Sequence, residues 1–215
     1  MNKSSLTIIA LAACLITSGC VTGRRTVSLP VTPVTGPGAT KGAIFVGAIE
    51  DHRGFQNKPS VASIPSIDGD VTKVAKAQLA TMIGRQRNAY GKAMGDIALP
   101  DGDSVMQRMQ ALLEAGLKRH GYSISATATA ANTATAKITE FWAWCTPGMW
   151  SVPFEANVAC DFTLSHGGVT TDLMVRGHGR NQGQVASDAN WQLAYQRAFD
   201  DFLADLNTQL DKAGL

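Results

Sequence analysis

Charge of either sign is scarce and almost balanced in this chain of 215 residues. Only 17% of the residues are charged, and 19 Lys and Arg against 17 Asp and Glu leave a formal charge of +2. Proteins that bind nucleic acid through its phosphates carry a clear basic excess. The balance therefore excludes nucleic acid as the main partner, and a hydrophobic content of 45% excludes a disordered chain.

Internal repeats and the short motifs of catalysis are also missing. No fixed period runs through the sequence, which excludes solenoids and coiled coils. No Gly-x-Ser-x-Gly elbow is present. The histidines stand in no His-Glu-x-x-His setting, and no Cys-x-x-Cys pair occurs, so we predict no metal site. They are His52, His120, His166 and His178. We therefore assign no catalytic residue and no cofactor, and we expect a protein that is not an enzyme.

The longest apolar run lies near the N-terminus, and it is too short to cross a membrane. It covers residues 6–16 after Lys3, whereas a spanning helix needs roughly 20 residues. This length is typical of a secretory signal peptide. The run is followed at once by Thr17-Ser18-Gly19-Cys20, which resembles a lipobox. We predict that residues 1–19 are removed and that Cys20 carries the lipid, with palmitate among its acyl chains.

Two alternatives to Cys20 stay open. Leu11-Ala12-Ala13-Cys14 fits a lipobox better by its letters, but it leaves a shorter apolar stretch ahead of it. An ordinary secretory signal with a chance cysteine is the other alternative. Val21 stands where an Asp would favour retention in the inner membrane of enterobacteria. Because this Asp is absent, we expect anchoring at the periplasmic face of the outer membrane. Two or three acyl chains hold a protein at a membrane stably.

Residues 20–40 are rich in proline and glycine, and they predict a tether between the lipid and a domain of residues 41–215. Proline forbids a helix and weakens a strand. The breakers are Pro30, Pro33, Gly36, Pro37 and Gly38. An extended tether of this length would hold the domain up to roughly 60 Å from the lipid.

The hydrophobic pattern of residues 41–215 predicts one α+β domain. Ser104 and Gln107 have the spacing of a capping box, and Gly121 ends that helix. A second helix begins at Ser187 or Asp188 and continues to about residue 210. Strands are expected at residues 43–49, 122–126, 134–145, 154–164 and 169–175, with a short helix within 71–83. We predict an antiparallel sheet of about four to five strands, with two main helices on one face, in the order strand, helix, strands, helix.

Cys145 and Cys160 are the remaining cysteines of an exported chain, so we predict a disulfide between them. The apolar alternation changes phase between Ile138 and Phe141, which indicates a β-bulge near Thr139-Glu140. The bulge would bring Cys145 to the face that carries Cys160. The alternative is two small buried hydrophobic residues.

Two segments are candidates for partner binding. Trp144, Met149 and Trp150 surround Thr146-Pro147-Gly148, where exposed aromatics at a hairpin tip would make a binding surface. The alternative is that they cover the core. Residues 84–92 are basic and rich in glycine, and a loop there would present its cations to an anionic polymer or a partner. These cations are Arg85, Arg87 and Lys92. The alternative is a solvated loop without a partner.

The order of these features resembles that of the YajG-like bacterial lipoproteins. The likeness covers about residues 41–210 and rests on weak motifs in a persuasive order. They are the lipobox, the strand Ala43–Ile49, the segment Ile83–Asp96, the helix ending in Gly121-Tyr122-Ser123-Ile124, the strand Ile138–Trp144 and the closing helix. The resemblance implies an envelope location and no catalytic residues.

From the sequence we expect a lipid-anchored binding, scaffolding or accessory lipoprotein of the envelope. Its expected partners are membrane lipid, through Cys20, and an envelope protein or peptidoglycan; its oligomeric state stays open. The alternative is an enzyme or a synthase-activating factor that acts on peptidoglycan or another envelope polymer.

Overall fold

The structure is a computed structural model that describes residues 23–33, 38, 40–129, 131–148 and 150–215. The signal peptide, Cys14, Cys20 and Met149 lie outside the described residues, so signal cleavage and lipidation stay predictions. Within the described part of the chain, no helix is both long and apolar enough to span a membrane.

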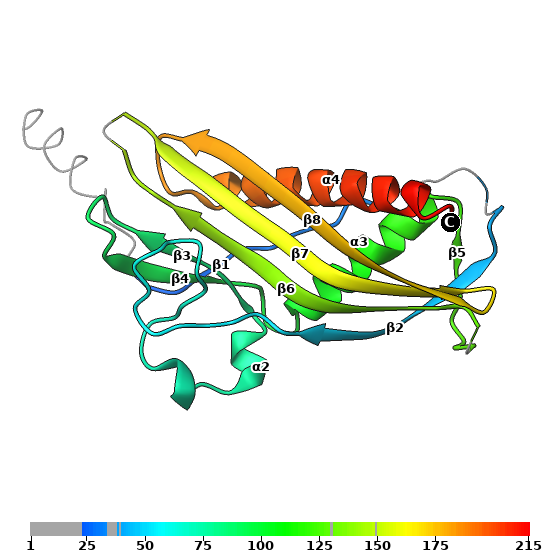
Figure 1. The fold of residues 1–215 in the computed structure, drawn as a ribbon. Helices are drawn as coiled ribbons and strands as arrows, with labels where there is room; N and C mark the ends of the chain where they lie inside the picture. Colours follow the sequence, from blue (N-terminus) through cyan, green and yellow to red (C-terminus); the bar gives the residue numbers. More distant parts are fainter. Residues whose placement is uncertain (1–22, 34–37, 39, 130, 149) are drawn as a thin grey trace, which may run out of the picture.

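One sheet of eight strands dominates the molecule (Figure 1). Its strands are β1 (Arg25–Thr26), β2 (Ala43–Asp51), β3 (Met82–Arg87), β4 (Ala93–Ala98), β5 (Ser123–Ile124), β6 (Thr133–Cys145), β7 (Val152–His166) and β8 (Val169–Gly183). The helices are the short 3-10 helix η1 (Val71–Lys73), α2 (Lys76–Leu79), α3 (Val105–Arg119) and α4 (Asp188–Lys212).

Strand β6 organises the sheet because both of its edges are used. One edge pairs antiparallel with β7, which pairs antiparallel with β8. The other edge is shared: residues 133–138 pair parallel with β2, and residues 143–145 pair parallel with β3. A register shift between Ile138 and Glu140 confirms the predicted bulge, and it lies where β2 leaves the sheet and β3 enters it.

The prediction of a four- to five-stranded antiparallel sheet with two helices is wrong. The sheet has eight strands and is mixed, because β1 with β4, β2 with β5, β2 with β6 and β3 with β6 all pair in parallel. The described chain also has three α-helices rather than two. Parallel neighbours are joined through long crossover segments, and local periodicity reveals a strand without revealing its partner.

Helices α3 and α4 cover one face of the sheet and enclose the main core. Ser104 caps α3 as expected, since its side chain accepts a hydrogen bond of 3.3 Å from the backbone N–H of Gln107. Helix α4 packs on β7 and β8, close enough to β8 that a Cβ at Gly179 would lie 2.0 Å from the carbonyl oxygen of Ala194. The buried residues of α4 are Trp191, Ala194, Tyr195, Ala198, Phe199, Phe202, Leu203, Leu206 and Leu210.

Residues 25–31, which we expected in a free tether, instead pack against the domain. Strand β1 pairs with β4, and both Val27 and Leu29 are 1% exposed. Gln192 of α4 donates a hydrogen bond to the carbonyl oxygen of Ser28 at 3.0 Å, and Arg108 of α3 donates one to that of Leu29 at 3.3 Å. The prediction of a free spacer of up to roughly 60 Å is therefore wrong. The side chains of Val27 and Leu29, which precede the first proline, Pro30, point into the core.

The opposite face of the sheet is covered only at one end. Residues 52–81 cross this face between β2 and β3, and Phe55 and Ile67 pack there against Met82 and Trp142. Arg53 holds the segment in place, because its guanidinium donates hydrogen bonds to the carbonyl oxygens of Met82 and Phe141 at 2.6 and 2.9 Å. The remainder of this face has no covering layer among the described residues.

Candidate functional site

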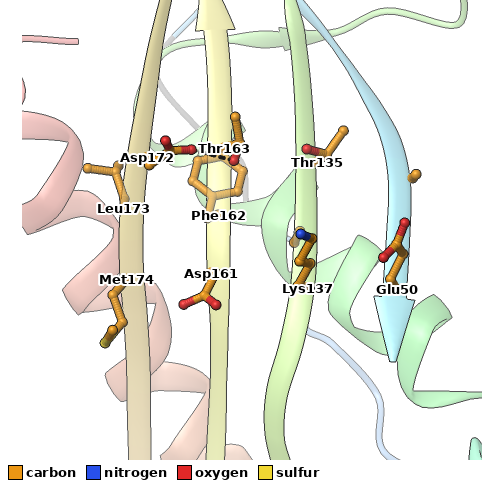
Figure 2. A pocket seen from close by; sticks show the side chains of 11 residues that line it. Glu50, Thr135, Lys137, Asp161, Phe162, Thr163, Asp172, Leu173 and Met174 are labelled. Atoms are coloured by element: carbon orange, nitrogen blue, oxygen red, sulfur yellow. Dashed lines mark hydrogen bonds between the residues drawn. The ribbon is translucent and has the colours of Figure 1, made fainter. Parts of the chain in front are cut away.

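The uncovered part of the sheet forms a shallow hollow of about 500 Å³. We call it the open face and define it by the outward side chains of four strands: Glu50 of β2, Thr135 and Lys137 of β6, Asp161 and Thr163 of β7, and Asp172 and Met174 of β8. Alternate residues of a strand point to opposite sides of a sheet. Phe162, between Asp161 and Thr163, accordingly points into the core (0% exposed), while its neighbours face solvent (Figure 2).

The charges of the open face alternate across neighbouring strands. Glu50 is the register partner of Lys137, and Lys137 is the register partner of Asp161. Figure 2 shows Lys137 between the two carboxylates. On the next pair of strands, the hydroxyl of Thr163 donates a hydrogen bond of 2.6 Å to Asp172. The face thus presents one cation, three carboxylates and the threonine hydroxyls side by side, a pattern that suits recognition of a polar partner.

Apolar surface accompanies these charges. Met174 is 53% exposed on β8, and the guanidinium of Arg176, two residues further, lies 2.8 Å from its sulfur. Flexible, polarisable Met side chains are enriched in protein interfaces. An exposed Met beside mixed charges therefore favours a protein partner over a simple ion.

The polar surface continues along β7 and β8 toward the β6–β7 turn. His178 Nδ1 lies 2.8 Å from Asn157 Oδ1, and His178 Nε2 lies 3.9 Å from a Glu155 carboxylate oxygen. In the part of the chain that the structure describes, no three His, Cys, Asp or Glu side chains are grouped as metal ligands would be.

The predicted aromatic surface is divided by the structure. Trp150 is 84% exposed in the turn between β6 and β7. Trp144 is half-buried beside Trp142, under the segment that crosses the sheet, and packs against the second apolar cluster, formed by Ile67, Met82, Ala98 and Trp142. Met149 lies outside the described residues. Of this group, Trp150 is the described side chain that is free to meet a partner.

The predicted basic loop is also divided, because β3 runs through its first half. Arg85 and Arg87 are 5% and 8% exposed, whereas Lys92 is exposed in the β3–β4 turn. The expectation that both arginines reach a partner is therefore wrong. Burial, and next the nearby Arg85 charge, lower the pKa of Arg87.

Arg85 belongs to a buried ion pair. Its Nε lies 3.4 Å from an oxygen of Asp96, which is 3% exposed, and its guanidinium also donates to the carbonyl oxygen of Ile67. The other Asp96 oxygen accepts a hydrogen bond of 3.0 Å from the backbone N–H of Asp68. These contacts tie β3 and β4 to the crossing segment, so the pair is structural.

Cys145 and Cys160 are both buried with free thiols, and the predicted disulfide is wrong. The bulge does bring both side chains into the same core, as expected. However, Cys145 is the register partner of Phe154, and Cys160 is that of Ile138, so six strand positions, or roughly 20 Å, separate the thiols. Burial raises the pKa of both thiols, that of Cys160 to about 12.

Comparisons with known proteins add little to this geometry. No known protein family matches the chain, and no curated protein matches it. One similar solved structure is that of an uncharacterized protein, with 8% identity and a TM-score of 0.40, covering 89% of this chain and 95% of that one.

A second similar structure is that of a protein from Xanthomonas campestris assigned to the family DUF330. It has 9% identity and a TM-score of 0.43 and covers 88% of this chain and 99% of that one. At such values neither likeness supports an argument on function, and the resemblance to the YajG-like lipoproteins is not confirmed.

The sequence prediction missed the open face, although a signal for it was present. Lys137, Asp161, Thr163 and Asp172 alternate with the buried residues of long strands. That pattern predicts one solvated face. It does not reveal that strands far apart in the chain bring opposite charges together.

Proposed function

We propose that this chain is a lipid-anchored binding protein of the bacterial envelope, and that it holds a polar partner on the open face. The observation that carries the proposal is the difference in coverage between the two faces of the sheet. Helices α3 and α4 bury one face, while β2, β6, β7 and β8 leave the other hollowed and lined by both signs of charge.

The proposed cellular setting rests on the lipobox predicted at Cys20 and on the resemblance of the sequence to the YajG-like lipoproteins. A chain anchored at the periplasmic face of the outer membrane would meet envelope proteins and peptidoglycan. Of these, the open face suits a protein, because Met174 adds exposed apolar area to the charges.

The alternative of an enzyme or activator on an envelope polymer needs carboxylates that converge on a substrate. On the open face, Lys137 separates Glu50 from Asp161, and Asp172 accepts the hydroxyl of Thr163. The carboxylates are thus matched to neighbours of their own sheet, which favours binding over catalysis.

Photo-crosslinking in intact cells tests the proposal. A photoreactive amino acid at Asp161 or Met174 samples the open face, and one at Ala204 samples the exposed side of α4 as a control. We expect a discrete protein adduct from positions 161 and 174, and none from 204. Capture of peptidoglycan would favour the alternative, and equal capture from all three positions would contradict a binding role for this face.

Charge variants provide an independent check. Reversing the central charge with Lys137→Glu places three carboxylates on neighbouring strands, because Lys137 lies between Glu50 and Asp161. We expect this variant to lose the adduct, while Lys118→Glu, an exposed change on α3, keeps it.

A further inference from the structure

Three loops lie at one end of the sheet, and among the described residues each exposes a large apolar side chain. Tyr90, in the β3–β4 turn, is 95% exposed; Trp150, in the β6–β7 turn, is 84% exposed; and Val185, between β8 and α4, is 65% exposed. We call these side chains the three tips.

The pairing of the strands places the three tips together. β3 ends beside the end of β6, since Gln86 is the register partner of Cys145. β8 ends beside the start of β7, since Gly183 is the partner of Val152. Three strand spacings separate β3 from β8, which is roughly 15 Å. Figure 1 shows the β6–β7 turn, the end of β8 and the β3–β4 turn at the same end of the molecule.

Hydrogen bonds within each loop hold its tip outward. Around Tyr90, the Asn88 side-chain oxygen accepts from the backbone N–H groups of Tyr90 and Lys92 at 3.0 and 2.9 Å. Around Trp150, the N–H of Gly148 donates to the carbonyl oxygen of Ser151 at 2.9 Å. These hydrogen bonds order the backbone from which the exposed side chains project.

Asn190 fixes the third loop in the same way. Its side-chain amide donates to the carbonyl oxygen of Val185 at 2.9 Å, and the N–H of Ser187 donates to the same oxygen at 2.9 Å. All three tips therefore stand on loops with internal hydrogen bonds.

The three loops lack acidic residues, and this lack favours an anionic membrane surface as their partner. Residues 88–92, 146–151 and 184–187 contain no Asp or Glu, and their one charged residue is Lys92. Tyr and Trp side chains prefer the polar–apolar boundary of a bilayer, where the ring is buried and its polar group stays wet. A basic residue beside them is attracted to anionic lipid.

The N-terminal segment leads to the same end of the molecule. The backbone N–H of Gly23 donates to the carbonyl oxygen of Met94 at 3.2 Å, next to the β3–β4 turn. Only Val21 and Thr22 lie between Gly23 and Cys20, so the covalent chain allows at most roughly 11 Å between Gly23 and a lipidated Cys20. The lipid therefore cannot hold the domain far from the bilayer.

We infer that the three tips form a membrane-docking surface, on which the domain sits with Trp150 and Tyr90 in the headgroup layer of the bilayer that holds the anchor. The inference rests on the proposed lipid anchor at Cys20. In this pose the long strands rise from the membrane, and the open face stands beside it, accessible to a partner.

Fluorescence quenching by brominated lipid tests the docking. The acylated full chain is reconstituted into vesicles of phosphatidylethanolamine and phosphatidylglycerol, with or without bromine on the acyl chains. Trp142 and Trp191 are 1% exposed, and Trp144 is half-buried under residues 52–81, so quenching by lipid reports on Trp150. The difference between the emission of the wild type and that of Trp150→Phe is the emission of Trp150. We expect brominated vesicles to quench this difference and to leave the emission of Trp150→Phe unchanged.

A second variant moves the reporter to the far end of the strands. Val169 is 63% exposed in the β7–β8 turn, and β7 separates it from the three tips by roughly 45 Å. We expect no quenching in the double variant Trp150→Phe, Val169→Trp. Absence of quenching in the wild type, or equal quenching of both reporters, would overturn the docking surface. The mass of the N-terminal peptide decides the anchor separately, so failure of the anchor and failure of the docking are distinguishable.

Discussion

Substitution of Gly179 is the sharpest test of how helix α4 sits on the sheet. A Cβ at this position of β8 would lie 2.0 Å from the carbonyl oxygen of Ala194 and 2.4 Å from the backbone nitrogen of Ala198. Non-bonded carbon atoms pack at about 3.5–4.0 Å. In Gly179→Ala the helix must therefore move away from the strand by more than about 1 Å.

That displacement loosens the main core along its length. Nine residues of α4 are buried, and backbone of a helix cannot yield as the end of a flexible side chain can. Overpacking of a core costs about 1–3 kcal/mol, and more where backbone has to shift. We expect Gly179→Ala to lose about 3 kcal/mol of unfolding free energy, measured by urea denaturation, and to lower Tm by roughly 6–12 °C.

Gly54→Ala is the matched control. Nothing lies within 4 Å of a Cβ at Gly54, which is exposed in the segment after β2. Removing a glycine from such a site changes stability by less than about 1 kcal/mol. If Gly179→Ala were as stable as Gly54→Ala, the close contact between α4 and β8 would be refuted, and with it the assignment of the two faces.

Two further predictions concern buried polar and sulfur groups. Cys145 and Cys160 should react with a maleimide only after unfolding. Burial raises the pKa of Cys160 to about 12 from an ordinary value of 9.0, so the thiol loses its proton more readily in the unfolded chain. Its contribution to stability is therefore complete below pH 9 and declines by about 1.4 kcal/mol per pH unit toward pH 12. A Cys160→Ala chain should lack that decline, and an oxidised pair in protein from the periplasm would contradict the structure. Arg85→Met leaves Asp96 buried without its cation and should lower the free energy of unfolding by roughly 3–5 kcal/mol, measured by urea denaturation. Lys92→Met, at an exposed site, should change it by no more than about 0.5 kcal/mol. Similar losses in the two variants would refute the structural role of the Arg85–Asp96 pair.

The sequence predicted those elements whose signals are local. The cap at Ser104 and the apolar stripe from Trp191 to Leu210 place α3 and α4 correctly. The phase change after Ile138 reveals the bulge of β6. Each signal depends on neighbours within a few residues, so it survives without knowledge of the fold.

Features set by distant contacts were predicted wrongly. The letters of β3 resemble a basic loop, yet Arg85 is buried because Asp96 and residues 66–68 supply its partners. The disulfide failed for a similar reason: the side-chain phase was right, but the register of β6 on β7 separates Cys145 from Cys160. Residues 20–40 were expected to be extended by their composition. Residues 28–31 do lie against α3 and α4, which the sequence did not predict.

The mass of the N-terminal peptide, from protein extracted out of the membrane fraction, tests the central claim most directly. We expect a chain that begins at Cys20, with a diacylglycerol thioether on its sulfur and residues 1–19 removed. Lipid on Cys14 would add six residues between the anchor and Gly23. An unmodified Cys20 in a chain released from the membrane would contradict the anchored binding protein proposed here.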